Sequence, residues 1–232
     1  MKILALEASS LVASAAIAED DNLIAEYTVN HKKTHSQTIM GMLDEIVKMT
    51  ELELSQLDAI AVTGGPGSFT GLRIGAASVK GLAMALSKPV VSIPTLEALA
   101  FNMWGTDMLI CPMMDARRGQ VYTGLYEFSK ENELKVILDQ VPLSIEEIAE
   151  KINESGRSVV VLGDGVEPNR EKLAECIKVP MSTAPLTLNR QRAASVAALG
   201  IKYFKEGKSM SPESFAPDYL RLSQAERERL SK

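Results

Sequence analysis

The chain has few of the residues that most often carry redox, metal or disulfide chemistry. Among 232 residues there are two cysteines, two histidines and one tryptophan, and aromatic residues make up only 5%. Cys111 and Cys176 are far apart and form no CxxC pair, which argues against a disulfide framework and suits a reducing compartment. Buried thiols are the simpler interpretation of both.

An excess of positive charge is also missing. Lysine and arginine number 25 against 30 acidic residues, a formal net charge of −5, whereas proteins that grip nucleic acid by themselves usually carry a basic face. No stretch approaches the roughly 20 apolar residues of a membrane span. The N-terminus enters a strand directly and Glu7 interrupts the apolar run, so no signal peptide is expected. These features predict a cytoplasmic protein with no membrane partner.

What the chain does have is the glycine-rich stretch Gly64–Gly75, GGPGSFTGLRIG. A short buried strand, Leu57–Thr63, precedes it, and apolar residues at helical spacing follow it. A loop between a strand and a helix N-terminus presents backbone N–H groups that suit a phosphate or a carboxylate. The stretch is no Walker A element and is one residue too long for GxGxxG, so a tight strand-to-helix turn is the alternative.

From this stretch we take nine residues as candidates for contacts at a cleft or with a partner. Arg73 would meet an anion or pair with an acid. The set is Gly64, Gly65, Pro66, Gly67, Ser68, Phe69, Thr70, Gly71 and Arg73.

The first hundred residues predict a mixed α/β lobe. Three strands, Lys2–Glu7, Ala13–Ala18 and Leu23–Val29, form an antiparallel meander with an acid at the end of the first strand. Thr34-His35-Ser36-Gln37 has the form of a capping box, which predicts a helix to about Met49. A strand and a helix follow the glycine stretch, and then come strand Val90–Ile93 and a helix from Thr95 to about Met103.

The same order of elements then starts again. Strand Leu109–Asp115 ends in an acid, and strands Gln120–Phe128 and Glu133–Val141 follow it. Further along are helix Ile145–Asn153, strand Val159–Leu162, a second glycine loop, and helices Pro168–Cys176 and Ala193–Phe204. We therefore expect two duplicated lobes with a cleft between them: residues 1–103, residues 104–210, and a tail, 211–232, that packs back on the first lobe. The candidate cleft acids and loop are Glu7, Asp115, Gly163, Asp164 and Gly165.

Two helices have more apolar or small surface than one core requires. The apolar residues of helix Thr34–Met49 spread over roughly 180°, whereas a stripe of about 100° covers one core. The helix after the glycine loop contains Gly75 and Gly81, each costing up to about 1 kcal/mol relative to alanine. Burial against a partner chain is the preferred explanation, and burial within the same chain is the alternative. The predicted interface is Ile39, Met40, Leu43, Val47, Leu72, Gly75, Ala76 and Val79.

Five segments together resemble the TsaB (YeaZ) family, within the actin/hexokinase/Hsp70-like superfamily with its RNase H-like fold. They are ILALEASS, HSQTI, GGPGSFTGLRIG, MDARRGQVY and PDYLR, and they span the chain. The resemblance implies a non-catalytic paralogue of TsaD, the metal-bearing subunit that transfers threonylcarbamoyl to tRNA. It also implies pairing with TsaD, help in recruiting the TsaE-type ATPase, indirect contact with tRNA, and a homodimer when the partner is absent. No cofactor would be tightly bound, and ATP or ADP would bind only in the assembled complex.

The residues that hold the metal in TsaD-like sequences are missing. The resemblance aligns Thr95 and Leu99 with the two histidines of their HxxxH motif, and neither residue replaces an imidazole ligand. His31 and His35 do form HxxxH, but the predicted cap at Thr34 leaves His31 outside the helix. We predict no metal, with His35 at the start of a helix. The superfamily more often has aspartate where Glu7 stands, which further weakens a hydrolytic role.

Two other functions stay open from the residues. One is a stand-alone ATP-dependent kinase or ATPase that would use the cleft, with Glu7 and Asp115 at the phosphates and Gly163–Gly165 near the adenosine. The other is a metallopeptidase, although the chain has no HExxH, GxSxG or defensible Cys–His pairing.

Overall fold

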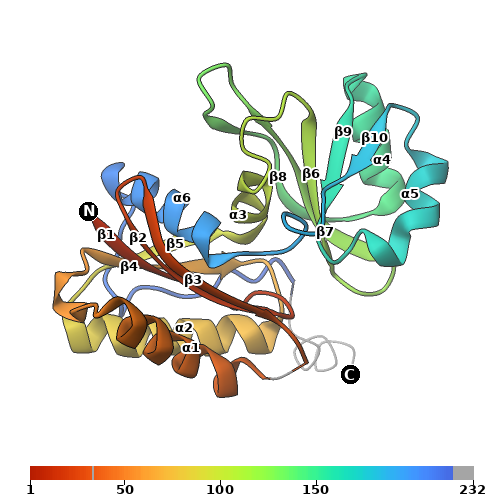
Figure 1. The fold of residues 1–232 in the computed structure, drawn as a ribbon. Coiled ribbons are helices and arrows are strands. Elements are labelled where there is room, and N and C mark those ends of the chain that lie inside the picture. Colours follow the sequence, from red (N-terminus) through yellow and green to blue (C-terminus); the bar gives the residue numbers. More distant parts are fainter. Residues whose placement is uncertain (33, 222–232) are drawn as a thin grey trace.

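The computed structural model describes residues 1–32 and 34–221, which form two lobes side by side (Figure 1). Each lobe is built on a five-stranded mixed sheet. The strand orders are β3-β2-β1-β4-β5 and β10-β9-β6-β7-β8. The strands of the first sheet are β1 (Lys2–Glu7), β2 (Val12–Glu19), β3 (Asn22–Asn30), β4 (Ala59–Gly65) and β5 (Val90–Pro94). Those of the second are β6 (Leu109–Asp115), β7 (Gln120–Phe128), β8 (Leu134–Ser144), β9 (Val159–Leu162) and β10 (Met181–Thr183).

The two sheets have the same topology, with β6 to β10 in the places of β1 to β5. In each sheet the first three strands pair antiparallel, and the fourth pairs parallel with both the first and the fifth. This duplication confirms the predicted actin/hexokinase/Hsp70-like architecture of two lobes. The helices are α1 (His35–Thr50), α2 (Phe69–Leu86), α3 (Thr95–Phe101), α4 (Ile145–Ser155), α5 (Arg170–Cys176) and α6 (Ala193–Lys205), with short 3₁₀ turns at Leu54–Gln56 and Glu167–Asn169.

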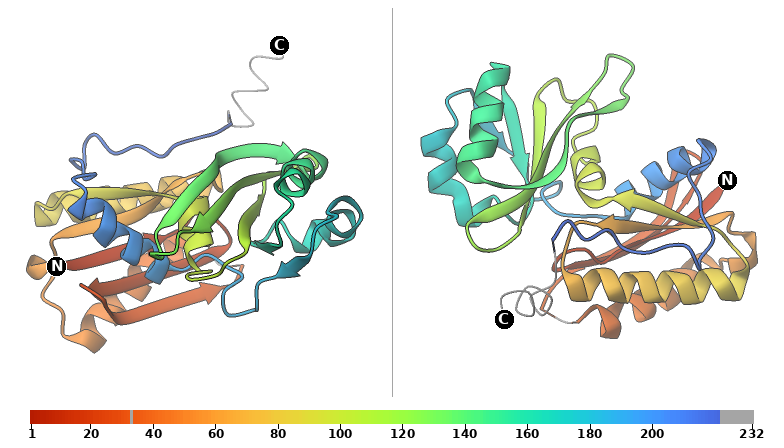
Figure 2. Two further views of the ribbon diagram at one scale, coloured as in Figure 1. Left: turned by 90° about the horizontal axis from the view of Figure 1, so that it is seen from above. Right: turned by 180° about the vertical axis from the view of Figure 1, so that it is seen from behind.

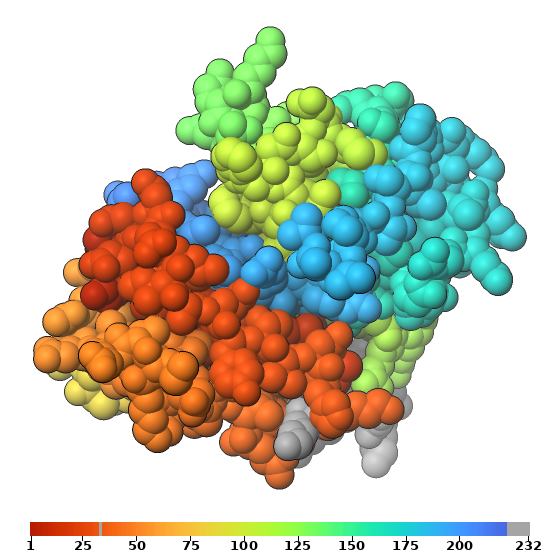
Figure 3. Space-filling model, in the orientation of Figure 1, coloured from red at the N-terminus to blue at the C-terminus, as the bar shows by residue number. Residues whose placement is uncertain are grey.

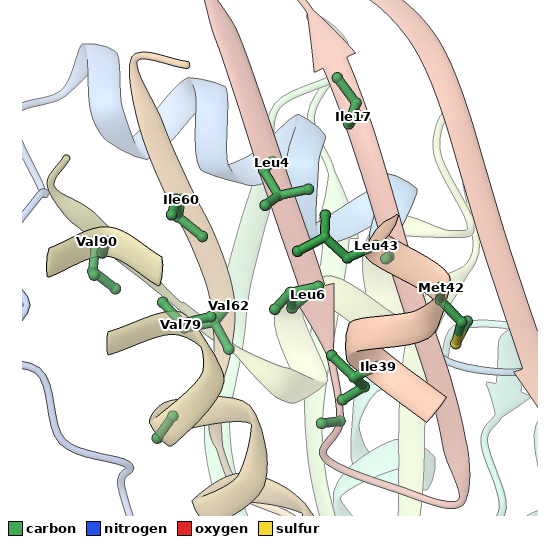
Figure 4. Close-up of a cluster of buried hydrophobic side chains, with 14 of the residues drawn as sticks. Leu4, Leu6, Ile17, Ile39, Met42, Leu43, Ile60, Val62, Val79 and Val90 are labelled. Carbon is green, nitrogen blue, oxygen red and sulfur yellow. The ribbon is translucent and has the colours of Figure 1, made fainter. Parts of the chain in front are cut away.

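Strands β1 and β4 are apolar on both faces because helices cover both faces of the first sheet. One core lies between this sheet and helices α1 and α2 (Figure 4). Leu4 and Leu6 of β1 lie near Leu43 of α1, and Val62 of β4 lies beside Val79 of α2. Helix α6 covers the other face with Val196, among other residues. The second lobe has its own cores, against α4 and α5 on one face and α3 on the other.

Two predictions need correction, and one strand was not predicted. Helix α6 falls within the range predicted for the C-terminal lobe, 104–210, but it packs on the first sheet, where its apolar stripe has a face to cover. Thr34 stands at the N-cap of α1, yet its side chain makes no cap hydrogen bond, so the capping box is absent there. Strand β10 was not predicted, because three residues carry too short a pattern.

The tail packs back on the first lobe as far as it is described. Residues 208–221, which we call the C-terminal segment, run from the end of α6 along the first lobe to the junction with the second (Figure 2). Met210 pairs with Val90 at the edge of β5, and Phe215 is buried in the core beneath α2. The rest of the predicted tail, 222–232, lies outside the described residues.

Candidate functional site

The glycine loop lies against the turn between β1 and β2. The Ser68 amide donates to the Ser9 carbonyl over 2.7 Å, and a Cβ on Gly67 would stand 2.3 Å from that oxygen. A Cβ on Gly71 would lie 2.1 Å from the Ala8 carbonyl oxygen. The glycines are therefore required for close packing of two backbones, as the turn interpretation of the loop predicts.

The C-terminal segment and the second lobe meet the other side of the same loop. The Asp218 amide donates to the Gly64 carbonyl over 2.7 Å. Gly65 has φ +129°, and a Cβ there would lie 2.1 Å from the Asp218 carbonyl oxygen. From β8, the Gln140 side-chain amide donates to the Gly65 carbonyl over 3.1 Å. Three remote parts of the chain thus converge on the loop.

An aromatic stack marks the start of α2. The rings of Phe69 and Tyr219 are parallel within 5°, with 4.1 Å between centroids, and Arg73 lies over both rings. Two residues after Tyr219, the Arg221 guanidinium donates to the Ala116 carbonyl over 2.8 Å and lies over the ring of Tyr122. Arg73 thus packs on aromatic rings, and its Nε donates a hydrogen bond to the Tyr219 hydroxyl over 3.4 Å.

Glu7 is fully buried at the end of β1. One carboxyl oxygen accepts hydrogen bonds from the Ser9 amide over 2.6 Å and the Ser9 hydroxyl over 2.5 Å. Removal from water raises the pKa of the Glu7 carboxyl to about 7, although the Ser9 hydrogen bonds act in the opposite direction. A carboxyl in this position is closed off from solvent and is shared between its charged and neutral forms near neutral pH.

The corresponding acid of the second lobe is placed differently. Asp115 is exposed at the end of β6, where it accepts a hydrogen bond from the Arg117 amide over 2.7 Å. Burial raises the pKa of Asp164, in the second glycine loop, and Arg190 partly opposes that effect. In that loop the Gly163 amide bonds the Asn189 side chain and the Gly165 amide bonds the Met113 carbonyl. These two amides are occupied and do not point at an open phosphate site.

The segment just before α6 covers the junction between the lobes on the face shown in Figure 3. Gln191 accepts a hydrogen bond from the Ser10 hydroxyl, and the Asn102 side-chain amide donates to the Leu188 and Arg190 carbonyls. Gln140, Asn189 and Gln191 were not predicted, since no local pattern in the sequence distinguishes them. Tyr219 and Arg221 had a signal, because they belong to the PDYLR segment.

The positions aligned with metal-binding histidines are buried in apolar surroundings. Thr95 and Leu99 are both 0% exposed in α3, and Leu99 packs in the core of the second lobe. His35 does begin α1, where its Nε2 lies 2.7 Å from the Ser10 carbonyl oxygen. His31 is exposed outside the helix. In the described part of the chain, no three or more His, Cys, Asp or Glu side chains gather where they could hold a metal.

Most of the residues predicted for a partner interface belong to the chain's own core. Helices α1 and α2 pack on each other as well as on the sheet, which accounts for the wide apolar arc of α1. Burial within the chain, the alternative, therefore accounts for the buried set, and contact with a partner stays a prediction for these residues. Met40 is 50% exposed and Val47 is partly buried. The buried positions are Ile39, Leu43, Leu72, Gly75, Ala76 and Val79.

Two duplicated lobes, with a buried acid at the first β-turn and a glycine loop packed on it, show the actin/hexokinase/Hsp70-like fold. A solved structure of the ethanolamine utilization protein EutJ from Carboxydothermus hydrogenoformans shares this fold, with a TM-score of 0.50 and 12% identity over 85% of this chain and 89% of that one. Across residues 22–229 the sequence also matches the family model TsaD, tRNA N6-adenosine threonylcarbamoyltransferase.

The chain belongs to the TsaB (YeaZ) family. It is 34% identical to the tRNA threonylcarbamoyladenosine biosynthesis protein TsaB of Bacillus subtilis (strain 168), over 97% of this chain and 96% of the relative. Identity to the TsaB of Escherichia coli (strain K12) is 27% over 95% of each chain. A crystal structure of a Pseudomonas aeruginosa protein described as similar to peptidase YEAZ superposes with a TM-score of 0.80, at 26% identity over 95% of this chain and 99% of that one.

Proposed function

We propose that this chain is a non-catalytic scaffold or activating subunit in the synthesis of tRNA N6-threonylcarbamoyladenosine. It pairs with a TsaD-type transferase, helps to recruit a TsaE-type ATPase, and reaches tRNA through these partners. The names of its relatives, which are biosynthesis proteins of this modification, support the pathway. The proposal includes a cytoplasmic location and a homodimer in the absence of the partner. None of the helices in residues 1–32 and 34–221 is long and apolar enough to cross a membrane.

The observation that carries the pairing is the outer surface of α1 and α2, which we call the outer helix face. Gly41 and Gly81 lie inside these helices, and a Cβ added to either would meet nothing within 4 Å. Packing within the chain therefore does not explain either glycine, although each costs about 1 kcal/mol relative to alanine. Close approach of helices from a second chain explains both.

Exposed methionines on the same helices support this surface. Met40 of α1 and Met84 of α2 are 50% and 55% exposed, and Ala77 is an exposed small residue of α2. Methionine is a flexible apolar residue that is common at interfaces that adapt to more than one partner. The outer helix face thus offers small residues for close contact and adaptable apolar side chains around them.

The second candidate, a stand-alone ATP-dependent enzyme, meets an obstacle in Glu7. A carboxylate that holds a magnesium–nucleotide complex has to reach solvent, but Glu7 is 0% exposed and bonded to Ser9. In the second glycine loop, the amides of Gly163 and Gly165 are already bonded. Magnesium-dependent ATP hydrolysis by the isolated chain would favour this candidate over the scaffold.

Reconstitution tests the scaffold directly. A TsaD-type protein, a TsaE-type ATPase, the adenylate-forming enzyme, threonine, bicarbonate, ATP and unmodified tRNA are combined with and without this chain, and the modified nucleoside is measured by mass spectrometry. Modification that depends on the chain, with no ATP hydrolysis by the chain alone, supports the proposal. Equal modification in both reactions contradicts it.

The interface is tested with two matched alanines. Ala77→Arg places a long charged side chain on the outer helix face. We expect this variant to lose pairing with the TsaD-type protein, as measured by size-exclusion chromatography with light scattering. Ala174→Arg makes the same change at an exposed position of α5 and should pair normally. Normal pairing of both variants would mean that the outer helix face is not the interface.

A further inference from the structure

Four arginines lie in or beside the contacts that the C-terminal segment makes with the two lobes. Arg73 lies over Phe69 and Tyr219, with its Cζ 5.1 Å and 5.9 Å from the ring centroids. Arg221, two residues after Tyr219, donates to the Ala116 carbonyl and lies 5.8 Å from the centroid of Tyr122. Two more arginines directly follow Ala116. We call this set the arginine strip: Arg73, Arg117, Arg118 and Arg221, with the rings of Phe69, Tyr122 and Tyr219.

The turn after β6 does not call for arginine on structural grounds. Arg117 and Arg118 have φ angles of 61° and 57°, the left-handed region that side chains with a Cβ disfavour. Glycine or asparagine would suit this backbone better. Both arginine side chains are exposed, so packing in the core does not explain the choice of arginine either. Their presence points to a role outside the stability of the turn.

The strip also concentrates positive charge in an acidic protein. Among the described residues, no arginine of the strip forms an ion pair with a carboxylate, whereas Arg157, Arg170 and Arg192 do. Two exposed acids flank it, Asp115 and Asp218. Against a net charge of −5 for the whole chain, this is a local excess of cations interleaved with aromatic rings.

We propose that the arginine strip binds an RNA strand directly. Guanidinium groups hold phosphates through charge-assisted hydrogen bonds, and aromatic faces stack with exposed bases. Arg73 and Arg221 are already held against rings, which limits the side-chain entropy lost on binding. The proposed function leaves tRNA to the partners, and the inference adds a direct contact by this chain. It rests on that function only for the choice of tRNA as the probe.

The experiment measures fluorescence anisotropy of a labelled, unmodified tRNA anticodon stem-loop with the full chain, alone and paired with a TsaD-type protein, between 50 and about 200 mM salt. The test variant is Arg117→Gln with Arg118→Gln. We expect about tenfold weaker binding at the lowest salt, and a slope of log K against log salt that is smaller by about 1.4, from about 0.7 per lost phosphate contact. Tyr219→Ala removes a stacking ring and also releases Arg221 with the C-terminal segment, so it should weaken binding about tenfold and lower the slope by about 0.7.

The matched control is Arg157→Gln with Arg170→Gln, which also removes two charges, from exposed arginines outside the strip. Unchanged binding by this control, with a loss in the test variant, supports the strip. Binding of the test variant equal to that of the unaltered chain, or an equal loss in the control, overturns it. The proposal is also overturned if ADP displaces the chain from RNA while the salt slope of the test variant equals that of the unaltered chain. Size-exclusion chromatography of the same samples measures pairing with the TsaD-type protein, and this result tests the proposed function separately.

Discussion

Tyr219 stacks on Phe69, which joins the C-terminal segment to the first turn of the helix after the glycine loop, 150 residues away along the chain. The planes of the two rings are parallel within 5°, and the ring centroids are 4.1 Å apart. The Asp218 amide bonds Gly64 beside them. The stack therefore closes the outer side of the loop whose inner side packs on the β1–β2 turn.

Replacing Tyr219 by alanine should release the C-terminal segment. Aromatic pairs contribute about 0.5–1.5 kcal/mol beyond their buried area, so we expect a loss of about 1–2 kcal/mol in the free energy of unfolding in urea. Hydrogen exchange of the amides of residues 216–221 should increase. Tyr219→Phe keeps the ring and should behave like the unaltered chain. Equal exchange in both variants would show that the stack does not hold the segment.

Substitutions of Met40 and Leu43, three residues apart on α1, should have different effects on stability and on pairing. Leu43 is 4% exposed and Met40 is 50% exposed. Leu43→Ala leaves a cavity against the sheet and should cost about 2–5 kcal/mol. Met40→Ala should change the free energy of unfolding by less than about 0.5 kcal/mol, yet weaken pairing with the partner. Urea denaturation of the isolated chain measures both changes, and a large stability loss in Met40→Ala would contradict the assignment of faces.

Glu7 should make the protein less stable as the pH rises. Its pKa is raised from 4.5 to about 7 in the folded chain, so between these values the folded state binds more protons than the unfolded state. Its contribution is therefore most favourable below pH 4.5 and is lost as the pH rises to 7, by ~3 kcal/mol for the full shift. Glu7→Gln should flatten this dependence in urea unfolding at pH 5 and pH 8.

The control for Glu7 is Glu150→Gln, which changes an exposed carboxyl of α4. This variant should keep the pH dependence of the unaltered chain. If Glu7→Gln keeps it too, the carboxyl does not titrate in the range that its burial implies.

Replacing Gly81 by alanine should stabilise the isolated chain but weaken its pairing with the partner. A Cβ at this position meets nothing, so Gly81→Ala should raise the free energy of unfolding of the isolated chain by about 1 kcal/mol. The added methyl group should weaken association with the partner, because close approach of a second helix would no longer fit. Gly71→Ala is the contrast, since its Cβ would lie 2.1 Å from the Ala8 carbonyl oxygen and should lower stability. Unchanged pairing in Gly81→Ala would contradict the role of this glycine.

Much of the fold was predictable because its signals are local. The bounds of β1, β6, β7 and β9 match the predicted ranges, since each is an apolar run ended by an acid or a turn. The repeated order of strands and acids was visible for the same reason. The candidate site was harder, because burial of Glu7 and the occupied amides of Gly163 and Gly165 depend on segments distant in sequence.

Most strands, the two glycine loops and the duplicated order could be predicted because each depends on spacing and turn chemistry over a few residues. Contacts between distant segments set which face of α1 is covered and place α6 on the first sheet. They also bring Tyr219 to the glycine loop and Arg221 to the β6–β7 turn. The physical reason is the same in each case. An amphipathic pattern says that a helix has a face to bury, but the surface that covers it is supplied by residues far away in the chain.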